Sequence, residues 1–364
     1  MAAAGPMRFD RLWDLALYDP EVGFYETGGS AGRRGDFITS VELGPLFGAC
    51  LARRLDASWD AADRPERWQL VDVGAGPGTL ARAVISAQPR CLGALEVVLV
   101  ERSAAQRVGH HGVIEWAAER GVRVASRPDL PSGVRGLIVA HELLDNLPVR
   151  VVQRHLDVVV ELWAEADESA DPPATHAVRP GAGARNEVAV SLSWRPVPAA
   201  DAVELAAAPW WPAVPVGRPV PWARAAAAWV AHALAALEDG SLLVVDYGAP
   251  GTAALADREG WLRTYADGAV GTDPTQSLGS RDITADVPFD QLGSFARLSS
   301  QADALAAWGI DELVAAARAR LADRPPGTMD LQWARDTSVL NEAPSLVDPA
   351  GLGGFLMAEW DTDG

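Results

Sequence analysis

The sequence predicts an α/β fold built on an open, mostly parallel β-sheet, and three observations support that prediction. Short apolar runs that are typical of buried strands alternate with alanine-rich segments that are typical of helices. One run, at residues 70–73, leads directly into three glycines at alternate positions, Gly74, Gly76 and Gly78. Another run, at residues 136–140, ends in a group of acidic residues. Because ligands of open parallel sheets bind beyond the carboxyl ends of the strands, both strand ends belong to one candidate site.

Composition fits a globular protein, and charge and hydropathy argue against a nucleic-acid partner and a membrane span. The 364 residues are 49% hydrophobic and 22% charged, which is enough for one large or two ordinary domains. Acidic residues outnumber basic ones by 49 to 31, and the net charge of -18 argues against a nucleic-acid partner bound through its phosphates. No membrane span is expected, because no stretch of about 20 apolar residues lacks a charge. Residues 1–8 show no signal-peptide pattern.

Cysteine and histidine usage predicts neither a disulfide framework nor a metal site. Cys50 and Cys91 are the two cysteines, and the six histidines show no His-x-x-x-His spacing. The expected compartment is therefore the cytoplasm. The richness in alanine, arginine, glycine and proline fits a bacterial source with a GC-rich genome.

Residues 1–60 are expected to form N-terminal helices and a flap loop. Residues 7–17 carry apolar side chains at helical spacing and end at a Tyr-Asp-Pro turn. A glycine-rich loop follows, which contains Asp36 and Thr39 and precedes a helix expected at residues 41–59. A loop of this length is either a flap that places Asp36 and Thr39 over a cofactor or a surface loop before a structural helix.

Residues 61–149 are expected to form the first part of a cofactor-binding domain. Glycine permits a tight turn and the close approach of a ligand, and a helix expected at residues 79–87 offers free N–H groups. The Gly-x-Gly-x-Gly spacing differs from the Gly-x-Gly-x-x-Gly of dinucleotide sites and is typical of S-adenosylmethionine methyltransferases. Asp72 and the glycine turn would then hold the methionine part of the cofactor. The alternative is a glycine-rich turn that binds no cofactor.

Two further acids follow the next two predicted strands. The strand at residues 95–100 ends in Glu101, whose carboxylate can accept hydrogen bonds from both ribose hydroxyls of a cofactor. A helix is expected at residues 102–112 and a third strand at residues 122–125. Asp129 lies just beyond that strand, where an acid can face the adenine amino group.

The fourth strand, at residues 136–140, ends in a motif that contains His141, Glu142, Asp145 and Asn146. If the turn is helical, the spacing of Glu142 and Asp145 places both acids on one face, toward the methyl acceptor. A carboxylate pair can hold a guanidinium and accept the proton lost on methyl transfer, so these two are the expected catalytic residues. The alternative is that either acid only caps the following helix. His141 can act as a base, although a structural role is favoured.

The remainder of the chain is expected to form an inserted β-containing subdomain, residues 150–220, and the rest of the main domain, residues 221–364. The inserted part has strand-like runs around a polar loop, and its tryptophans are expected to pack in a small core rather than line an acceptor cleft. Elements expected after residue 220 are a helix at 222–237 ended by Gly240, a strand at 241–245, a helical segment at 302–322 broken at Gly309, and an apolar tail at 346–358 that packs as a final strand or docking segment.

Taken together, these residues resemble the MidA family, which includes the mitochondrial complex I assembly-factor arginine methyltransferase. The matching segments follow the family's order to about residue 285. They are residues 16–20, 23–25, 35–40, 46–48, the glycine motif, Glu142 with 145–149, 246–248, 262–265 and 282–284. The resemblance implies a class I methyltransferase fold with a seven-stranded, mostly parallel Rossmann-like sheet. It also implies S-adenosyl-L-methionine as the cofactor.

For function, the resemblance implies methyl transfer to a nitrogen of a protein side chain, an arginine of a respiratory-complex subunit. His141 stands where the family usually has asparagine, Asn146 replaces a usual small residue, and Asp286 stands in the place of a histidine. His141 and Asn146 are therefore candidate substrate-binding residues on the acceptor side. Two alternatives remain, a small-molecule acceptor in a biosynthetic pathway and an assembly chaperone that binds the cofactor without turnover. A homodimer is compatible with the sequence.

Overall fold

The computed structural model of this chain describes residues 5–27, 40–166, 189–266, 268–325 and 327–362. The chain divides into two compact units, each assembled from three separate stretches. The first unit contains Met1–Gly29, Asn146–Ala227 and Gly248–Gly293. The second unit contains Ser30–Asp145, Ala228–Tyr247 and Ser294–Gly364. None of the described helices is both long and apolar enough to cross a membrane.

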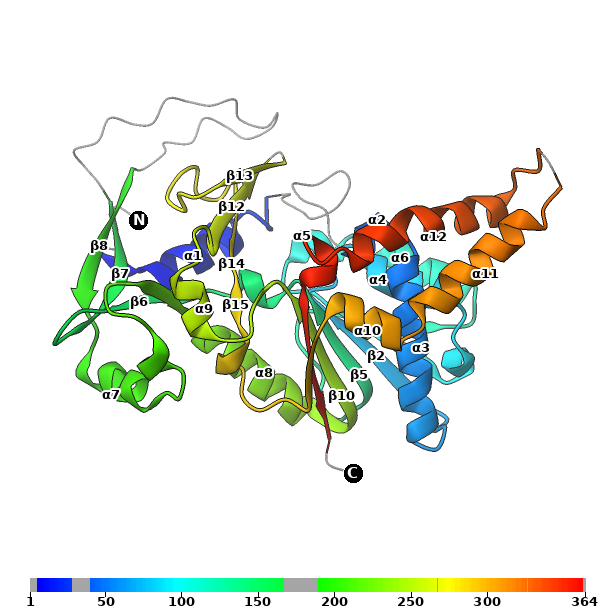
Figure 1. Cartoon of the computed structure of the whole chain (residues 1–364), viewed down its shortest axis with the longest axis horizontal. Coiled ribbons are helices and arrows are strands. Elements are labelled where there is room, and N and C mark those ends of the chain that lie inside the picture. The colour runs from blue at the N-terminus through cyan, green and yellow to red at the C-terminus, as the bar shows by residue number, and fades with distance from the viewer. Residues whose placement is uncertain (1–4, 28–39, 167–188, 267, 326, 363–364) are drawn as a thin grey trace. The chain divides into compact units, whose positions relative to one another are not determined.

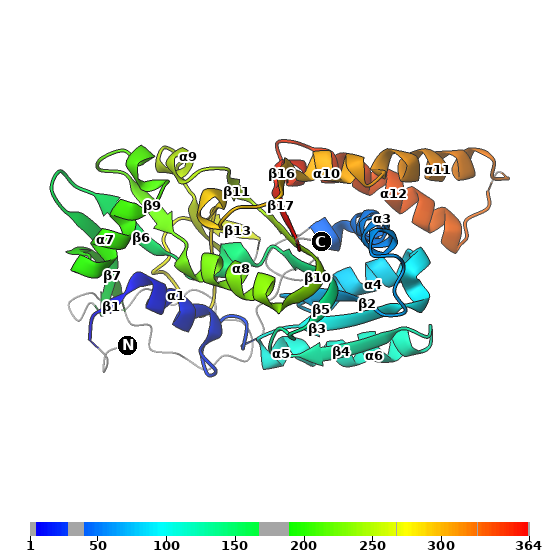
Figure 2. The same ribbon diagram turned by 90° about the horizontal axis from the view of Figure 1, so that it is seen from below.

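The second unit is built around a seven-stranded sheet of order β16-β17-β10-β5-β2-β3-β4. Figure 1 labels the central strands β2, β5 and β10, and Figure 2 labels every strand of this sheet. Neighbouring strands from β10 to β4 run parallel, whereas β17 is antiparallel to both of its neighbours. This arrangement confirms the predicted α/β class with a mostly parallel, seven-stranded sheet. The strands are β2 (Trp68–Val73), β3 (Leu95–Val100), β4 (Arg123–Arg127), β5 (Val134–His141), β10 (Leu237–Asp246), β16 (Arg297–Ser300) and β17 (Leu356–Asp361).

The strand order reverses beside β2, where β3 lies on one side and β5 on the other. The register aligns the ends of four parallel strands. Val73 is opposite both Val100 and Ala140, and His141 is opposite Val245. The carboxyl ends of β2, β3, β5 and β10 therefore lie at one edge of the sheet, where ligands of such sheets bind.

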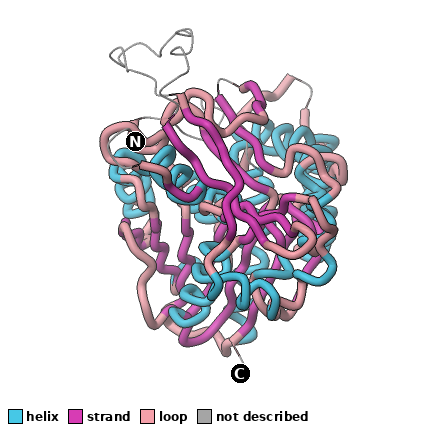
Figure 3. Tube along the Cα trace, turned by 90° about the vertical axis from the view of Figure 1, so that its left-hand side faces the viewer, coloured by secondary structure: helices cyan, strands magenta, loops and turns pink. Residues whose placement is uncertain are grey.

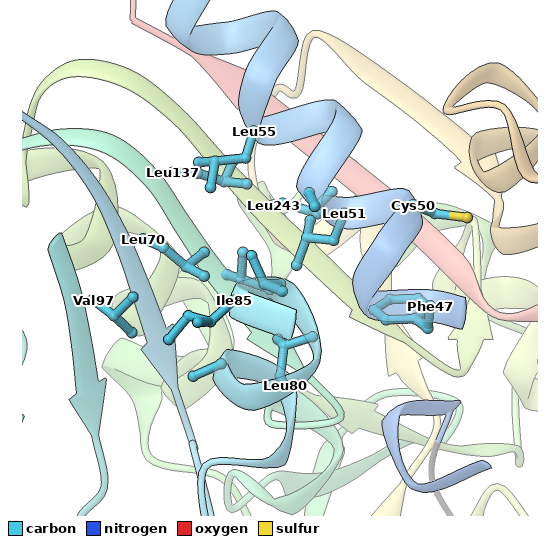
Figure 4. Close-up of a cluster of buried hydrophobic side chains, with 14 of the residues drawn as sticks. Phe47, Cys50, Leu51, Leu55, Leu70, Leu80, Ile85, Val97, Leu137 and Leu243 are labelled. Carbon is cyan, nitrogen blue, oxygen red and sulfur yellow. The ribbon is translucent and has the colours of Figure 1, made fainter. Parts of the chain in front are cut away.

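Helices α3 and α4 cover one face of this sheet and form the main core with it (Figure 4). Apolar side chains from both helices pack on side chains of β2, β3, β5 and β10, and burial of such surface is the dominant stabilising term. The labelled residues of this core are Phe47, Cys50, Leu51, Leu55, Leu70, Leu80, Ile85, Val97, Leu137 and Leu243. The α-helices of the unit are α2 (Ser40–Leu43), α3 (Leu46–Ala61), α4 (Thr79–Ser86), α5 (Ala104–Arg107), α6 (His110–Ala118), α10 (Gln301–Ala307), α11 (Ile310–Ala322) and α12 (Leu331–Val347), with the 3-10 turns η1 (Arg90–Gly93) and η5 (Leu352–Gly354).

The helix expected at residues 102–112 is instead divided into α5 and α6. The side chain of Ser103 accepts a hydrogen bond from the Gln106 N–H at the start of α5, and α6 begins after Gly109. Residue 110 was expected near the end of one helix, but it is the first residue of α6.

Gly240 does not end the helix before it, because α8 (Arg224–Ala236) stops four residues earlier and β10 already contains Gly240. A Cβ atom at Gly240 would lie 1.9 Å from the carbonyl oxygen of Gly136 in the neighbouring strand. The glycine is therefore required by close backbone approach between two strands. The boundary between the two units falls within α8.

The helix α12 was not expected, and it pairs with α11 as a hairpin (Figure 2). Asp330 caps α12 by accepting a hydrogen bond from the Trp333 N–H at 2.8 Å. Polar and apolar residues are mixed along its sequence, which also contains Pro344, so hydrophobic periodicity was a weak signal. The break expected at Gly309 does separate α10 from α11.

The first unit contains an antiparallel sheet of order β1-β7-β6-β9, with β8 also pairing with β7. Figure 3 draws the strands of both units in magenta. Trp211 and Trp222 are buried in its small core with Val152 and Leu205, as the packing interpretation of the tryptophans predicts. The elements of this unit are β1 (Met7–Arg8), α1 (Phe9–Tyr18), β6 (Arg150–Arg154), β7 (Val159–Ala166), β8 (Val190–Pro196), α7 (Ala199–Ala207), η3 (Trp211–Ala213), β9 (Pro219–Trp222), β11 (Gly248–Ala249), α9 (Thr252–Ala256), β12 (Leu262–Ala266), β13 (Ala269–Gly271), β14 (Asp282–Ala285), β15 (Val287–Pro288) and η4 (Phe289–Gln291).

Candidate functional site

The glycine turn after β2 uses backbone conformations that favour glycine at all three positions. The φ angles are 72° at Gly74, 50° at Gly76 and 81° at Gly78. A Cβ atom would lie 3.0 Å from Leu143 at Gly74 and 3.0 Å from Val113 at Gly78, whereas at Gly76 it would meet no atom of the described residues within 4 Å. The outer glycines therefore pack against the protein, and the described residues leave space beside Gly76 for a ligand.

Glu101 lies beside this turn at the end of β3. Its Oε2 accepts a hydrogen bond from the Gly76 N–H at 3.0 Å, and its Oε1 accepts one from the Ser103 N–H at 2.9 Å. The structure thus brings Glu101 and Gly76 together, as a shared cofactor site requires. Contact of Glu101 with ribose hydroxyls stays a prediction.

Asp72, inside β2, is a buried carboxyl group that lacks a full set of hydrogen bonds. Its residue is 3% exposed, and its Oδ2 accepts no hydrogen bond from any described residue. Burial, with a smaller contribution from the negative charge of Glu101, raises the pKa of Asp72 from 3.8 to about 7. Such a carboxylate is stabilised by a nearby cation. The ammonium group of an amino-acid moiety therefore fits this position.

Glu142 leaves the end of β5 in a strained conformation. Its φ of 51° is unusual for a residue with a Cβ, and a hydrogen bond from its N–H to the carbonyl oxygen of Val245 at 2.8 Å holds it there. The side chain is 8% exposed, and its Oε1 accepts a hydrogen bond from the Ser40 N–H at 3.3 Å. Burial, followed by the charge of Asp145, raises the pKa of Glu142 well above its ordinary value.

Asp145 lies on the 3-10 turn η2 (Leu144–Asn146), which Asp246 at the end of β10 holds in place. One oxygen of Asp246 accepts hydrogen bonds from the N–H groups of Leu144 at 2.9 Å and Asp145 at 3.2 Å. The Tyr247 hydroxyl donates to Asp145 Oδ2. Burial, then the charges of Asp145 and Glu142, raises the pKa of Asp246 well above its ordinary value. Three carboxyl groups are therefore gathered at the ends of β5 and β10.

Asp246 and Tyr247 were missed as site residues by the sequence analysis. A signal was present, since both belong to a matching family segment and follow an apolar strand. Their role depends on the parallel pairing of β10 with β5, which joins residues about 100 positions apart.

His141 lies among these acids as a neutral imidazole. Burial lowers the pKa of His141 to about 4, and its ring packs edge-on against Phe47 at a centroid distance of 4.9 Å. Its Nδ1 is 3.5 Å from Glu142 Oε1, and its Nε2 has no hydrogen-bond partner among the described residues. The imidazole therefore contributes no positive charge to offset the carboxyl groups.

Asn146, the residue after Asp145, makes its hydrogen bonds within the first unit. Its Nδ2 donates to Asp282 Oδ1 at 2.9 Å, and the hydroxyl of Tyr25 donates to its Oδ1 at 3.1 Å. Asn146 thus ties together segments that match the family, while contact with an acceptor stays a prediction. Asp286, the other departure from the family pattern, is buried between the guanidinium groups of Arg258 and Arg263.

The remaining expected site residues lie away from these contacts. Asp129 is exposed in the loop after β4, and contact with adenine stays a prediction for it. Asp36 and Thr39 lie outside the described residues. Their neighbour Ser40 is buried, and its hydroxyl donates to Gln301 Oε1 at 3.0 Å. Ser40 therefore joins Glu142, through its N–H, to Gln301, through its hydroxyl, and neither Ser40 nor Gln301 was predicted as a site residue.

The glycine turn, Glu101 and the acidic strand ends all lie within the part of the chain that matches one family model. The family model described as "Putative S-adenosyl-L-methionine-dependent methyltransferase" matches residues 50–307. The chain belongs to this family. S-adenosyl-L-methionine is the cofactor named in the description of this family, and the buried carboxylate of Asp72 fits the ammonium group of that molecule.

Relatives and a solved structure support this assignment. The chain is 29% identical over 220 residues to the protein arginine methyltransferase NDUFAF7 homolog of Drosophila melanogaster, covering 54% of this chain and 49% of that protein. It is 26% identical over 323 residues to human NDUFAF7, covering 81% and 66%. The chain thus spans about half to two thirds of these relatives. A COG1565 superfamily crystal structure from Burkholderia thailandensis, bound to S-adenosyl-homocysteine, matches with a TM-score of 0.79 and 27% identity, covering 100% of this chain and 90% of that one.

Proposed function

We propose that this enzyme transfers the methyl group to a nitrogen of an arginine side chain in a protein. The observation that supports the proposal is the buried acidic cluster of Glu142, Asp145 and Asp246, in which the pKa values of Glu142 and Asp246 are raised. A guanidinium is always charged at neutral pH and binds carboxylates through two parallel hydrogen bonds. Its approach would restore the ionised form of these groups, a gain that a neutral acceptor would not provide.

The chemistry requires both alignment and removal of a proton. The cofactor supplies a methyl group bound to a positively charged sulfur. The acceptor nitrogen bonds to the methyl carbon while the carbon–sulfur electron pair returns to sulfur, and the nitrogen loses one proton. Glu142 would accept that proton, because the causes that raise its pKa also make its carboxylate a stronger base than an ordinary one once the guanidinium favours the ionised form. Asp145, held by Tyr247 and Asp246, would fix the orientation of the guanidinium.

The cofactor would be held at the neighbouring strand ends. In this proposal Asp72 binds the amino group, Glu101 accepts hydrogen bonds from the ribose hydroxyls, and the open side of Gly76 admits the cofactor to the main chain. The named relatives are protein arginine methyltransferases, which supports a protein acceptor. A respiratory-complex subunit as the acceptor, a cytoplasmic location and a bacterial source stay predictions.

Transfer of a labelled methyl group tests the acceptor class. The purified enzyme is incubated with methyl-labelled S-adenosylmethionine and a cell extract, and the protein fraction is hydrolysed to amino acids. We expect label in methylarginine. Glu142→Gln should lower the rate by about 10²- to 10⁴-fold, the usual contribution of a positioned base. Its affinity for S-adenosylhomocysteine should stay unchanged.

Glu115→Gln, on the exposed side of α6, is the matched control and should keep the full rate. Label found only in small molecules would favour a biosynthetic acceptor. Full turnover by Glu142→Gln would show that the role assigned to Glu142 is wrong.

A further inference from the structure

His110, the first residue of α6, lies behind the glycine turn and is only 1% exposed. Its Nε2 lies 2.7 Å from the carbonyl oxygen of Gly76, and its Nδ1 lies 2.7 Å from Ser126 Oγ in β4. A carbonyl oxygen can only accept, so Nε2 carries the hydrogen and donates it to Gly76. The Ser126 hydroxyl then donates to Nδ1. The imidazole is therefore held neutral and in one tautomer, which agrees with the lowering of its pKa by burial.

The backbone of Gly76 is consequently held by a side chain on each side. Its N–H donates to Glu101, and its carbonyl oxygen accepts from His110. The start of α6 also packs along the turn, since a Cβ at Gly109 would lie 3.8 Å from Pro77. Gly76 itself has a positive φ, and no atom of the described residues lies within 4 Å of its Cβ position, so packing restrains it little. These two hydrogen bonds therefore help to hold its conformation.

We propose that His110 is a positioning residue that keeps the glycine turn in the shape that binds the cofactor. Without the imidazole, the Gly76 carbonyl would lose its hydrogen-bond partner, and the turn would populate other conformations. Binding is weakened in proportion to the fraction of molecules that keep the competent shape. This inference rests on the use of S-adenosylmethionine and is independent of the proposed arginine acceptor.

Calorimetric titration of the full-length protein with S-adenosylhomocysteine tests the proposal. If the fraction of molecules with the binding-competent turn falls to about 1–10%, His110→Leu should raise the dissociation constant by about 10- to 100-fold. His110→Gln, whose amide can donate to the Gly76 carbonyl, should stay within about threefold of the wild type. With a suitable acceptor, the KM for S-adenosylmethionine should rise by the same factor in His110→Leu, while kcat at saturation stays within about twofold.

The control separates positioning from general destabilisation. Ala117, buried near the end of the same helix, is replaced by glycine, which should lower the melting temperature without changing affinity for S-adenosylhomocysteine. The proposal is wrong if His110→Leu binds as tightly as the wild type, or if His110→Gln loses as much affinity as His110→Leu. It is also wrong if Ala117→Gly weakens binding as much as His110→Leu. Absence of methylarginine beside the expected titrations would refute only the proposed acceptor.

Discussion

Replacing Asp72 by asparagine should stabilise the ligand-free protein more at alkaline than at acidic pH, relative to the wild type. Burial raises the pKa of Asp72 in the folded protein to about 7, from an ordinary value of 3.8. As the pH rises from about 4 to about 7, the unfolded chain therefore loses this proton first, and the free energy of unfolding falls. Above that range the penalty is constant. Asparagine has no such proton, so the variant escapes this part of the pH dependence.

The size of the effect follows from the pKa values. A shift of about three units corresponds to about 4 kcal/mol at 1.36 kcal/mol per unit, reached above about pH 8. At about pH 5 the unfolded chain is already mostly ionised at this residue, and about 1.5 kcal/mol of the penalty is present. Between about pH 5 and pH 8.5 the variant should therefore gain about 3 kcal/mol relative to the wild type. Any constant cost of burying the amide cancels in this comparison.

Urea unfolding of both proteins at the two pH values, without cofactor, measures this difference directly. The Asp72→Asn variant should also bind S-adenosylmethionine more weakly, because it has lost the charge proposed to bind the ammonium group. Calorimetric titration measures this affinity. Equal pH dependence of the two unfolding free energies would refute the assignment of a raised pKa to Asp72. Unchanged affinity for S-adenosylmethionine would refute its proposed contact with the cofactor.

Two further predictions concern the acidic cluster and are measured by the pH profile of kcat/KM. Asp145→Asn should lower the rate and move the acidic limb to lower pH, because the Asp145 charge is the second cause, after burial, of the raised pKa of Glu142; an unmoved limb would contradict this. Gln301→Leu should move the limb to higher pH and slow the reaction at neutral pH by about 2- to 10-fold, since it removes one hydrogen bond that anchors Ser40 behind Glu142. An unchanged profile would argue against the anchor.

Local signals explain what the sequence could predict. The strand, turn and helix around residues 70–87 were predictable, because an apolar run, three spaced glycines and an alanine-rich segment each favour one conformation. The positions of Glu101 and Glu142 at strand ends were predictable for the same reason, because Glu101 directly follows an apolar run and Glu142 follows one after a single residue. The expected boundaries nevertheless differ by a few residues where strands extend, as β5 does by taking in Val134 and His141.

Residues whose role depends on long-range pairing could not be predicted from the local sequence. His110 contacts Gly76 because the start of α6 lies against the glycine turn. Nothing in the sequence around His110 indicates this contact. Gln301 supports Ser40 across 261 positions of sequence. Gly240 looked like a helix end, and only the register of β10 against β5 shows that it permits close strand contact. Tertiary contacts, rather than local propensity, decide each of these positions.

The pairing of β5 with β10 also sets the order in which the protein can form during synthesis. Asp145 and Asp246 are 101 positions apart, and most of the intervening chain belongs to the first unit. At ribosomal rates of about 5–20 residues per second, β5 waits roughly 5 to 20 seconds for its neighbour. During that interval the glycine turn and Glu101 are already synthesised, whereas the backbone N–H groups of η2 lack the carboxylate of Asp246. A nascent chain halted in this window would hold an unpaired edge of β5, a feature on which chaperones and aggregation both act.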